Sequence, residues 1–406
     1  MIAPVRITGL DVTRGFAVMG ILAMNIVAFA MPEAAYITPR AWGGDTGPDL
    51  WIWAFNYVLL DSKMRGLFSM MFGASTLLVM QSAMASGRNP ARTHYARMAV
   101  LSLFGLAHFY LLWFGDILFL YAMTGMLLWF FRNLSVKALT IWGVALITLN
   151  ALPFSIGMGM FHYFATYGGP AEAIEAYRDF ASQFAPHAPA SVREVALFQS
   201  NFATIVAHNV SKDLWTPFFG VLQFGAETLG LMLAGSALYK SGLLRGEWSL
   251  ERLDKWRNLC LGIGVAGNLA LLALQFHTGL EPAFVLGATL GFSVPFDVVM
   301  SIGYAALFMG LAQRFASSAL IGRVAATGRA AFTNYLGTTL LMTTLFYGWG
   351  LGQFGQWSRI EVYAPVLVVW AIMLLWSKPW LDRYRFGPLE WLWRTLARGQ
   401  LQPLHR

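Results

Sequence analysis

Long apolar stretches, separated by short polar segments, divide this chain of 406 residues. A helix needs about 20 apolar residues to cross a bilayer, and most of the stretches are close to that length. The pattern predicts an all-α polytopic membrane helix bundle with about ten transmembrane helices. The predicted spans cover residues 15–31, 64–86, 98–114, 117–131, 136–164, 214–239, 259–276, 283–313, 330–348 and 361–377.

One long polar interruption separates two groups of spans. Residues 165–213 begin with a sequence typical of an amphipathic helix and continue through Pro186 and Pro189, which predict a break. We therefore expect an N-terminal transmembrane bundle at 1–164, an extracytoplasmic lid or cap at 165–213, and a C-terminal transmembrane domain at 214–406.

Three other segments depart from simple spans. Residues 50–60 are apolar but short, which favours a helix on the outer surface that leads into the second span. Pro295 falls within a run of about thirty apolar residues and predicts a kink or a broken helix. After Pro379, the mixture of Trp, Leu and Arg predicts an interfacial helix, either a simple anchor or a contact with anionic membrane lipids, with Trp391 and Trp393 at headgroup level.

The pattern of charged residues predicts the orientation of the chain in the membrane and gives little information about binding partners. The chain is 57% hydrophobic and 12% charged, with a net charge of +8. The basic residues are spread between the spans and not clustered on one soluble face, which argues against nucleic-acid binding. With both termini inside, 21 of the 28 basic residues fall on cytoplasmic segments, as the positive-inside rule requires. Lys63, Arg65 and Arg359 are among those that this topology leaves outside.

Few ionisable groups fall within or beside the spans, where each costs about 2.5–3.5 kcal/mol and therefore suggests function or pairing. Their predicted depths form a polar series from the inner to the outer face. The candidates are Asp11 and Arg14 at the inner face, Glu227 and Asp297 near the centre, and His108 and Asp116 toward the outer face, with Asn25 and Asn334 as neutral polar neighbours.

His108 and Asp116 flank a predicted hairpin turn at Gly115, so the two helices could bring the imidazole and the carboxylate together. A carboxylate that orients a histidine is the usual arrangement for a general base. The structural alternative is that His108 bonds a neighbouring helix while Asp116 caps the next helix.

The remaining candidates also have two interpretations. Asp11 and Arg14 form either an anchoring ion pair or a site where arginine holds a phosphate or carboxylate. Asp297 lies beside the predicted kink and could serve freed backbone groups, whereas Asn334 fits a bridge between helices. The histidines are scattered without ligand spacing, so no metal site is expected.

Six ordered motifs resemble the YeiB-like family of bacterial inner-membrane proteins, whose C-terminal part is a domain of unknown function. The resemblance implies a multi-pass protein of the bacterial inner membrane. The motifs are Arg6…Leu10-Asp-Val-Thr-Arg14-Gly15, Lys63-Met-Arg-Gly-Leu-Phe-Ser-Met-Met-Phe-Gly73, Gly115-Asp-Ile-Leu…Tyr121-Ala, Gly328-Arg-Ala-Ala-Phe-Thr-Asn334-Tyr, Phe346-Tyr-Gly…Gly350-Leu-Gly and Gly387-Pro-Leu-Glu-Trp-Leu-Trp-Arg394.

The opening Leu-Asp-x-x-Arg-Gly is also similar to the start of the transmembrane acyltransferase superfamily, which includes the lysosomal heparan acetyltransferase. In those enzymes a cytoplasmic acyl thioester serves an acceptor across the membrane. Asn25 matches, in its spacing from Arg14, a position held by His or Asn in those enzymes. The loop between the first two spans has no histidine, so His108 is the best substitute for the base.

The leading hypothesis is therefore a membrane acyltransferase with acyl-coenzyme A as donor substrate and no metal. Its catalytic candidates are His108, Asp116 and Asn25, and its binding candidates are Asp11, Arg14, Glu227, Asp297, Asn334 and Tyr121. The alternative is a transporter, or a protein that translocates a lipid or small metabolite, with Glu227 and Asp297 on the pathway. A homo-oligomer and a non-catalytic partner of envelope proteins also stay open.

Overall fold

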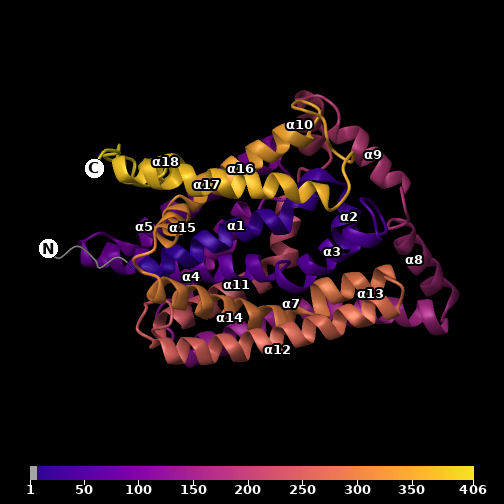
Figure 1. The fold of residues 1–406 in the computed structure, drawn as a ribbon, viewed down its shortest axis with the longest axis horizontal. Helices are drawn as coiled ribbons and strands as arrows, with labels where there is room; N and C mark the ends of the chain where they lie inside the picture. The colour runs from indigo at the N-terminus through magenta and orange to yellow at the C-terminus, as the bar shows by residue number, and fades with distance from the viewer. Residues whose placement is uncertain (1–6) are drawn as a thin grey trace.

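A computed structural model describes residues 7–406 as a bundle of long helices (Figure 1). Arg6, which opens the first motif, lies outside the described residues. The first half contains α1 (Thr8–Ala30), α2 (Glu33–Ile37), α3 (Gly47–Leu59), α4 (Lys63–Ala85), α5 (Pro90–Leu111), α6 (Leu118–Phe131), α7 (Val136–Tyr167), α8 (Ala171–Ser182), α9 (Pro189–Phe198) and α10 (Phe202–Ser211). The second half contains α11 (Thr216–Lys240), α12 (Leu250–His277), α13 (Pro282–Gly287), η1 (Ala288–Phe292), α14 (Val294–Arg314), α15 (Ala319–Arg329), α16 (Ala331–Phe346), η2 (Glu361–Tyr363), α17 (Ala364–Arg383) and α18 (Pro388–Arg398).

The predicted spans coincide with helices of the structure. In the described chain, 7 helical segments are long and apolar enough to cross a membrane: α1, α3 with α4, α7, α11, α12, α14, and η2 with α17. The other predicted spans fall on α5, on shorter helices such as α6 and α16, and partly on the segment before α14. The polytopic helical membrane fold is therefore confirmed, whereas the number of ten crossings and their orientation stay predictions.

The break predicted near Pro295 is present, although it begins before the proline. The helix α13 passes into a π-helical turn at Ala288–Phe292, and α14 then starts at Val294 with Pro295 in its first turn. Proline lacks an N–H donor, and the first helical turn is the position where that donor is not needed.

Large apolar side chains on the outer helices face away from the protein. Leu149 of α7 is 65% exposed, Ile263 of α12 is 47% exposed and Leu367 of α17 is 64% exposed. Exposure of such apolar surfaces to water costs free energy, whereas contact with lipid tails does not. These outward faces agree with a bundle embedded in a membrane.

Inside the bundle, glycines let two central helices approach closely. A Cβ added to Gly73 of α4 would lie 2.0 Å from the carbonyl oxygen of Met232, and one added to Gly235 of α11 would lie 1.9 Å from that of Met70. Small residues at such crossings are typical of membrane helices, whose association depends on close packing.

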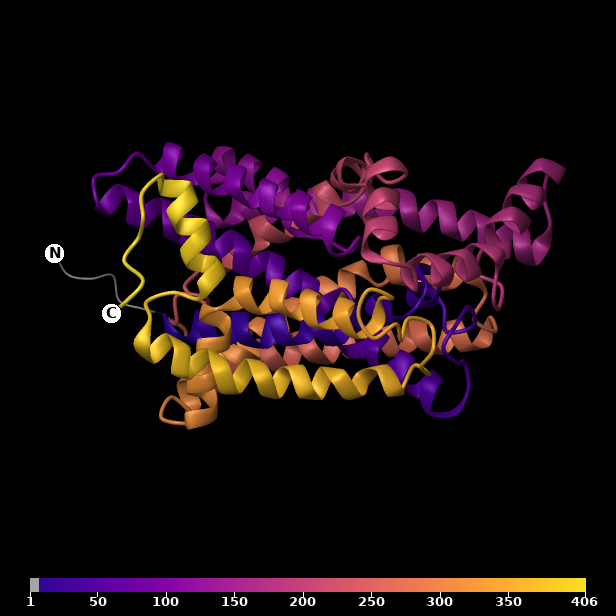
Figure 2. The same cartoon turned by 90° about the horizontal axis from the view of Figure 1, so that it is seen from above.

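The two ends of the bundle differ. The start of α1 and the C-terminal helix α18 lie at one end, called here the terminal end, and α8 and α9 lie at the opposite cap end (Figure 1). Figure 2 shows α18 running across the direction of the long helices. The helix at 171–182 and the break before Pro189 confirm the secondary structure predicted for the cap. The division into domains stays a prediction.

Candidate functional site: an arginine-lined cavity

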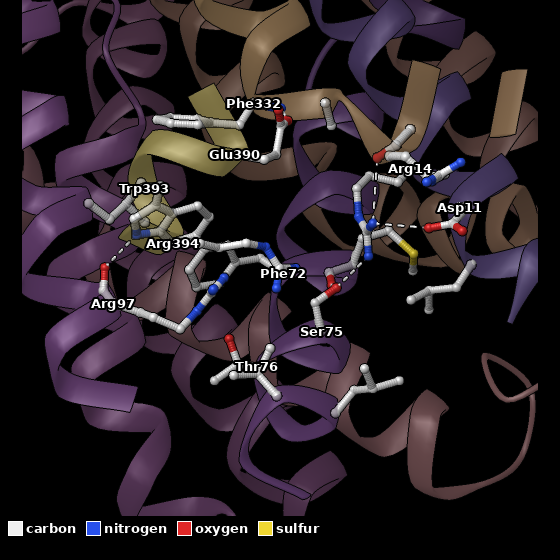
Figure 3. Close-up of a pocket in the computed structure, with 18 of the residues that line it drawn as sticks. Asp11, Arg14, Phe72, Ser75, Thr76, Arg97, Phe332, Glu390, Trp393 and Arg394 are labelled. Atoms are coloured by element: carbon white, nitrogen blue, oxygen red, sulfur yellow. Dashed lines mark hydrogen bonds and ion pairs between the residues drawn. The ribbon is translucent and has the colours of Figure 1, made fainter. Parts of the chain in front are cut away.

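A cavity of about 700 Å³ is lined by the start of α1 and by α18, the two elements that define the terminal end of the bundle. Its walls come from α1, α4, α5, α6, α16 and α18, so segments from both halves of the chain enclose it (Figure 3). Apolar side chains form much of the wall, and they include Phe68, Met71, Phe72, Leu101, Leu118 and Phe332. Charged side chains also line it, among them Asp11, Arg14, Arg97, Glu390 and Arg394. The cavity is therefore amphipathic, with several guanidinium groups beside an apolar interior.

Arg14 is held at the wall of this cavity by three acceptors. Its Nη2 donates to Ser75 Oγ at 2.7 Å, its Nη1 approaches Asp11 Oδ1 at 3.3 Å, and the same Nη1 donates to the carbonyl oxygen of Gly328 at 3.5 Å. The Asp11–Arg14 contact predicted from the one-turn spacing is confirmed. Ser75 and Gly328 come from α4 and α15, so Arg14 is positioned by tertiary contacts as well as by its own helix.

Two glycines of the recognised motifs explain how α1 reaches α15. A Cβ added to Gly15 would lie 2.2 Å from the carbonyl oxygen of Val324, and one added to Gly328 would lie 1.9 Å from that of Asp11. The backbones of the two helices therefore touch beside Arg14. The Arg-Gly and Gly-Arg motifs at 14–15 and 328–329, far apart in sequence, form one packed crossing.

The C-terminal helix closes one side of the cavity. The carboxylate of Glu390 accepts hydrogen bonds from the N–H groups of Phe332 and Thr333 at 2.7 and 3.1 Å, and from Thr333 Oγ1 at 2.6 Å. Burial raises the pKa of Glu390, while the hydrogen bonds from Thr333 act in the opposite direction. Glu390 thus docks α18 on the first turn of α16, where N–H groups lack helical partners.

The remaining contacts of α18 differ from those expected for a lipid anchor. Trp393 Nε1 donates to the carbonyl oxygen of Arg97 at 2.9 Å, and the Arg97 guanidinium lies 4.1 Å from the Trp393 ring. The indole of Trp393 therefore packs on the protein, while its placement at headgroup level stays a prediction. Arg394 lines the cavity. Its pKa is lowered mainly by burial and, to a smaller extent, by the positive charge of Arg398.

A polar contact leads from the cavity deeper into the bundle. Tyr121 lines the cavity, and its hydroxyl oxygen lies 2.6 Å from Ser69 Oγ. Ser69 donates to the backbone oxygen of Arg65, whose Nη2 lies 2.8 Å from Glu227 Oε1. The predicted central acid Glu227 is thus paired, and its partner Arg65 is inside the bundle and not in an outer loop.

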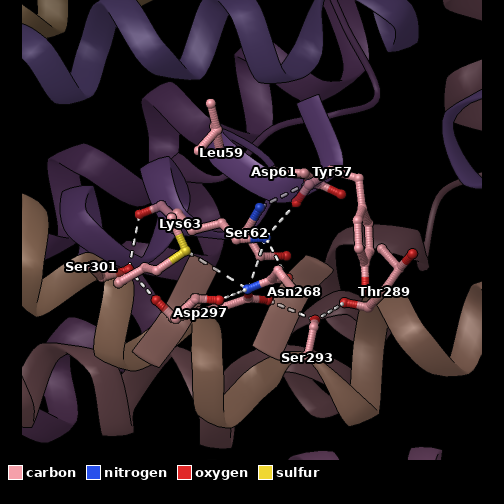
Figure 4. A network of polar contacts seen from close by, with 12 residues as sticks. Tyr57, Leu59, Asp61, Ser62, Lys63, Asn268, Thr289, Ser293, Asp297 and Ser301 are labelled. Atoms are coloured by element: carbon pink, nitrogen blue, oxygen red, sulfur yellow. Dashed lines mark hydrogen bonds and ion pairs between the residues drawn. The ribbon is translucent and has the colours of Figure 1, made fainter. Parts of the chain in front are cut away.

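Asp297, the other central acid, is also paired. Lys63 Nζ lies 2.8 Å from Asp297 Oδ1, and it donates to the carbonyl oxygen of Tyr57 at 2.5 Å and to Asn268 Oδ1 at 3.1 Å (Figure 4). Asp297 Oδ2 accepts from Ser293 Oγ at 2.7 Å. The Lys63 side chain is only 1% exposed, so this cation is paired inside the protein, while the membrane side on which it lies stays a prediction.

Arg359, another basic residue that the predicted topology leaves outside, is also buried. It is 1% exposed, and its guanidinium donates to the backbone oxygens of Ala35 and Trp42 at 2.9 and 3.0 Å. The positive-inside count placed Lys63, Arg65 and Arg359 on the outer side. Buried acceptors hold all three side chains, so they are not free surface charges.

The His108–Asp116 contact is confirmed, at 2.7 Å between Nδ1 and Oδ1. His108 Nε2 lies 2.9 Å from Thr339 Oγ1, and Asp116 Oδ2 accepts from the N–H of Phe119 at 2.8 Å. The carboxylate therefore orients the imidazole and also accepts from the first turn of α6, which confirms the structural interpretation, while the role of general base stays a prediction. Neither residue lines the cavity, but Tyr335 does, and its ring centroid is 5.4 Å from that of His108.

The two asparagines also lie outside the cavity wall. Asn334 Nδ2 donates to the backbone oxygen of Thr327 and to Ser377 Oγ, while its Oδ1 accepts from Trp376 Nε1. It bridges α15, α16 and α17, which confirms the structural interpretation. Asn25 is 8% exposed within α1.

Of the predicted site residues, the structure brings Asp11, Arg14 and Tyr121 to the cavity. His108, Asp116, Asn25, Glu227, Asp297 and Asn334 lie elsewhere in the described bundle. Sequence reasoning missed Ser75, Arg97, Glu390 and Arg394 as cavity residues. Glu390 and Arg394 belong to a recognised motif, which was the available signal, whereas Arg97 looked like a loop charge. Within residues 7–406, no cluster of three or more His, Cys, Asp or Glu residues has the arrangement of a metal site.

These features define a polytopic helical membrane protein with an arginine-lined cavity at one end. The family described as "Protein of unknown function (DUF418)" matches residues 238–400. The chain is 36% identical to the uncharacterized protein YeiB of Escherichia coli, over 96% of this chain and 95% of the relative. It is 29% identical to the uncharacterized protein YxaH of Bacillus subtilis, over 98% and 96% of the two chains. The chain therefore belongs to the YeiB-like family. No solved structure is significantly similar to it.

Proposed function

We propose that this protein is an acyltransferase of the bacterial inner membrane that binds an acyl-coenzyme A donor in the arginine-lined cavity. The observation that carries the proposal is the cavity itself, with Arg14 fixed beside an apolar interior of about 700 Å³. Arginine binds phosphate oxygens through two parallel hydrogen bonds, and an apolar pocket of this size suits a small organic group. With the predicted orientation, the cavity faces the cytoplasm, where such thioesters are made.

The proposed donor fits the division of the cavity wall. Its phosphate groups would lie near the guanidinium groups, and its acyl end would lie among Phe72, Leu101 and Leu118. Asp11 reduces the freedom of Arg14, because the carboxylate and Ser75 hold two of its nitrogens in place. A fixed guanidinium loses less entropy when it binds an anion.

The proposed reaction moves an acyl group from sulfur to the oxygen or nitrogen of an acceptor. The acceptor attacks the thioester carbonyl carbon, a new C–O or C–N bond forms, and the C–S bond breaks. His108 Nε2 takes the acceptor proton, and Asp116 stabilises the resulting cation. His108 then gives this proton to the departing coenzyme A thiolate, which leaves as the thiol and regenerates the neutral imidazole. Asn25 is proposed to polarise the carbonyl.

Access to His108 is the structural requirement of this reaction. Its Nε2 lies 2.9 Å from Thr339 Oγ1, and its side chain is 1% exposed. Tyr335 packs against His108 and also lines the cavity. Transfer therefore needs a rearrangement at Tyr335 and Thr339 that exposes Nε2 to the cavity.

A transport function has one specific observation in its favour. The contacts from Tyr121 through Ser69 to Arg65 and Glu227 extend the polar surface beyond the cavity. A translocated anion would need such groups along its route. Transport predicts uptake or export of an unchanged ligand, whereas the acyltransferase predicts an acylated product and free coenzyme A.

The test is the thermal stability of the detergent-solubilised protein with a panel of acyl-coenzyme A compounds. A ligand at about 100 times its dissociation constant stabilises the folded state by ~2.7 kcal/mol. We expect stabilisation of wild type, its loss in Arg14→Ala, and its retention in Arg92→Ala, which removes an exposed arginine from α5. If no thioester of the panel stabilises the wild-type protein, the proposal is overturned.

Product formation separates the two functions. Membranes that contain the wild-type protein should release free coenzyme A and label an acceptor, and His108→Ala should do neither while it still binds the donor. Full transfer by His108→Ala would contradict the assignment of the base. Movement of an unchanged anion, without free coenzyme A, would support transport instead.

A further inference from the structure

We propose that Arg97, Arg394 and Arg14 form one binding site for a diphosphate group, and that α18 completes this site by supplying Arg394. This inference rests on the proposed function in one respect: a diphosphate is part of the coenzyme A donor. It also applies to any other ligand that carries two adjacent phosphates, including a diphosphate-linked lipid.

The balance of charge around the three arginines carries the inference. Each comes from a different helix, and all three side chains line the same cavity (Figure 3). Arg14 has an acidic partner in Asp11. Among residues 7–406, no ion pair neutralises Arg97, and the charges that act on it most come from Arg394, Arg398 and Arg14.

The acid next to Arg394 is already engaged. Both oxygens of the Glu390 carboxylate accept hydrogen bonds at the start of α16, from the N–H of Phe332 and from Thr333. The cavity lining also includes Arg329 and Arg385, so five arginines share the cavity with only two carboxylates, Asp11 and Glu390. A ligand with two adjacent negatively charged phosphates offsets such an excess better than a carboxylate or a phosphodiester does.

The side chains are also held in orientations that leave N–H groups available. The Arg97 guanidinium stacks 4.1 Å from the Trp393 ring, and the Arg394 guanidinium lies 4.5 Å from the Phe386 ring. Stacking uses the face of the guanidinium plane and leaves its edge, which carries the donors, directed elsewhere. Figure 3 shows the side chains of Arg97 and Arg394 extending toward the part of the cavity that holds Arg14.

The helix α18 links this site to the fold. Trp393 donates to the backbone oxygen of Arg97 at 2.9 Å, and Arg394 is the next residue. The docking of α18 therefore places both the aromatic support of Arg97 and the third guanidinium. A helix that merely anchored the tail in lipid would need neither contact.

The experiment measures binding of four probes to the full-length protein in detergent, by thermal shift and calorimetry. Inorganic pyrophosphate tests the diphosphate alone, coenzyme A tests a soluble carrier, a polyprenyl diphosphate tests a lipid carrier, and S-acetylpantetheine tests a thioester without phosphate. The variants are Arg97→Ala and Arg394→Ala, with Arg92→Ala as the matched exposed arginine of α5. Arg97→Lys and Arg394→Lys serve as folded variants that keep the charge.

We expect pyrophosphate to bind the wild type, and we expect Arg97→Ala and Arg394→Ala to weaken it by about tenfold or more, because each removes charge-assisted hydrogen bonds. Arg92→Ala should bind pyrophosphate like the wild type, and the lysine variants should bind it with intermediate affinity. The affinity for S-acetylpantetheine should not change with any of the substitutions. Equal affinity of the wild type and both alanine variants for every diphosphate would overturn the inference.

The probes also separate this inference from the proposed function. Binding of pyrophosphate or the lipid diphosphate that depends on Arg97 and Arg394, without binding of coenzyme A or its thioesters, would support the diphosphate site and overturn the acyl-coenzyme A proposal. Binding of acyl-coenzyme A that depends on Arg14 but not on Arg97 or Arg394 would overturn the diphosphate site and leave the proposed donor intact.

Discussion

Two regions of this bundle enclose cationic side chains, and they differ in how many anionic partners surround those cations. Around Lys63, the ammonium group meets a carboxylate and two further oxygens, and its side chain is only 1% exposed. Around Arg97 and Arg394, the cations line a cavity, and the described residues supply too few anions to neutralise them. Buried charges with complete partners hold helices together, whereas buried charges without them favour a ligand that brings the missing charge.

The contrast is informative because both regions break the same rule. Ionisable groups are costly in a membrane protein, so each must be compensated within the fold or be retained for another reason. The Lys63 network is compensated by residues from α3, α12 and α14. The arginine cavity is not, and uncompensated departures from the rules of folding are expected at functional sites.

The largest expected effect comes from opening the paired network. Lys63→Met should reduce the free energy of unfolding by ~3–5 kcal/mol, because it leaves the Asp297 carboxylate buried without its cation. Thermal unfolding in detergent measures this loss. Lys378→Met removes a cation from an exposed pair with Asp382 and should change stability by under ~1 kcal/mol. Equal effects of the two substitutions would show that Lys63 is not structurally paired.

The next effect comes from separating the helices that frame the cavity. Gly328→Ala places a Cβ 1.9 Å from the backbone oxygen of Asp11, so α1 and α15 must move apart. Overpacking of this kind costs ~1–3 kcal/mol, and binding at Arg14 should weaken with it. Gly322→Ala on the same helix meets nothing within 4 Å and should leave both thermal stability and donor binding unchanged. If Gly328→Ala binds the donor as tightly as the wild type, Arg14 is not part of the donor-binding site.

A smaller and more local effect is expected from undocking α18. Glu390→Gln replaces a carboxylate that accepts three hydrogen bonds with an amide, so the contact should weaken by ~1–3 kcal/mol. The tail from Arg385 should then be cleaved faster by trypsin, and affinity for pyrophosphate should fall because Arg394 is displaced. Glu247→Gln, at an exposed pair with Arg245, is the control. An unchanged cleavage rate would mean that other contacts dock the helix.

The smallest effect concerns pH at the cap end, where two acids meet. Glu194 accepts hydrogen bonds from the N–H of Glu33 at 3.0 and 3.1 Å, and burial raises the pKa of Glu194 to about 7. Because the folded pKa lies above the unfolded value of 4.5, this group stabilises the cap fully below about pH 4.5, and the contribution is lost as the pH rises to about 7.

Hydrogen exchange in α9 should therefore be slower at pH 5 than at pH 7.5, after correction for the intrinsic dependence of exchange on pH. Glu194→Gln should reduce that difference and leave the smaller part that comes from Glu33, whose pKa burial also raises. The binding of pyrophosphate at the opposite end should not change. A pH dependence that is unchanged in Glu194→Gln would assign it to another group.

Several elements of the fold were predictable from the pattern along the chain alone. Apolar length predicts the long helices, since a bilayer sets their dimension, and Pro295 predicts the break before α14. Local spacing predicts the contacts of Asp11 with Arg14 and of His108 with Asp116, because each pair lies within one turn or across one hairpin.

The sequence also determined which residue types were available for a site, but tertiary structure decided which of them meet. Arg97 and Arg394 are separated by nearly three hundred residues and share a cavity because Glu390 docks α18 on α16 and Trp393 docks it on α5. Lys63, which the charge count placed on the outer side, is a buried partner of Asp297 because α4 packs against α14. Helix rotation and packing set these distances, and hydrophobic periodicity does not encode them, because lipid-facing and protein-facing surfaces are both apolar.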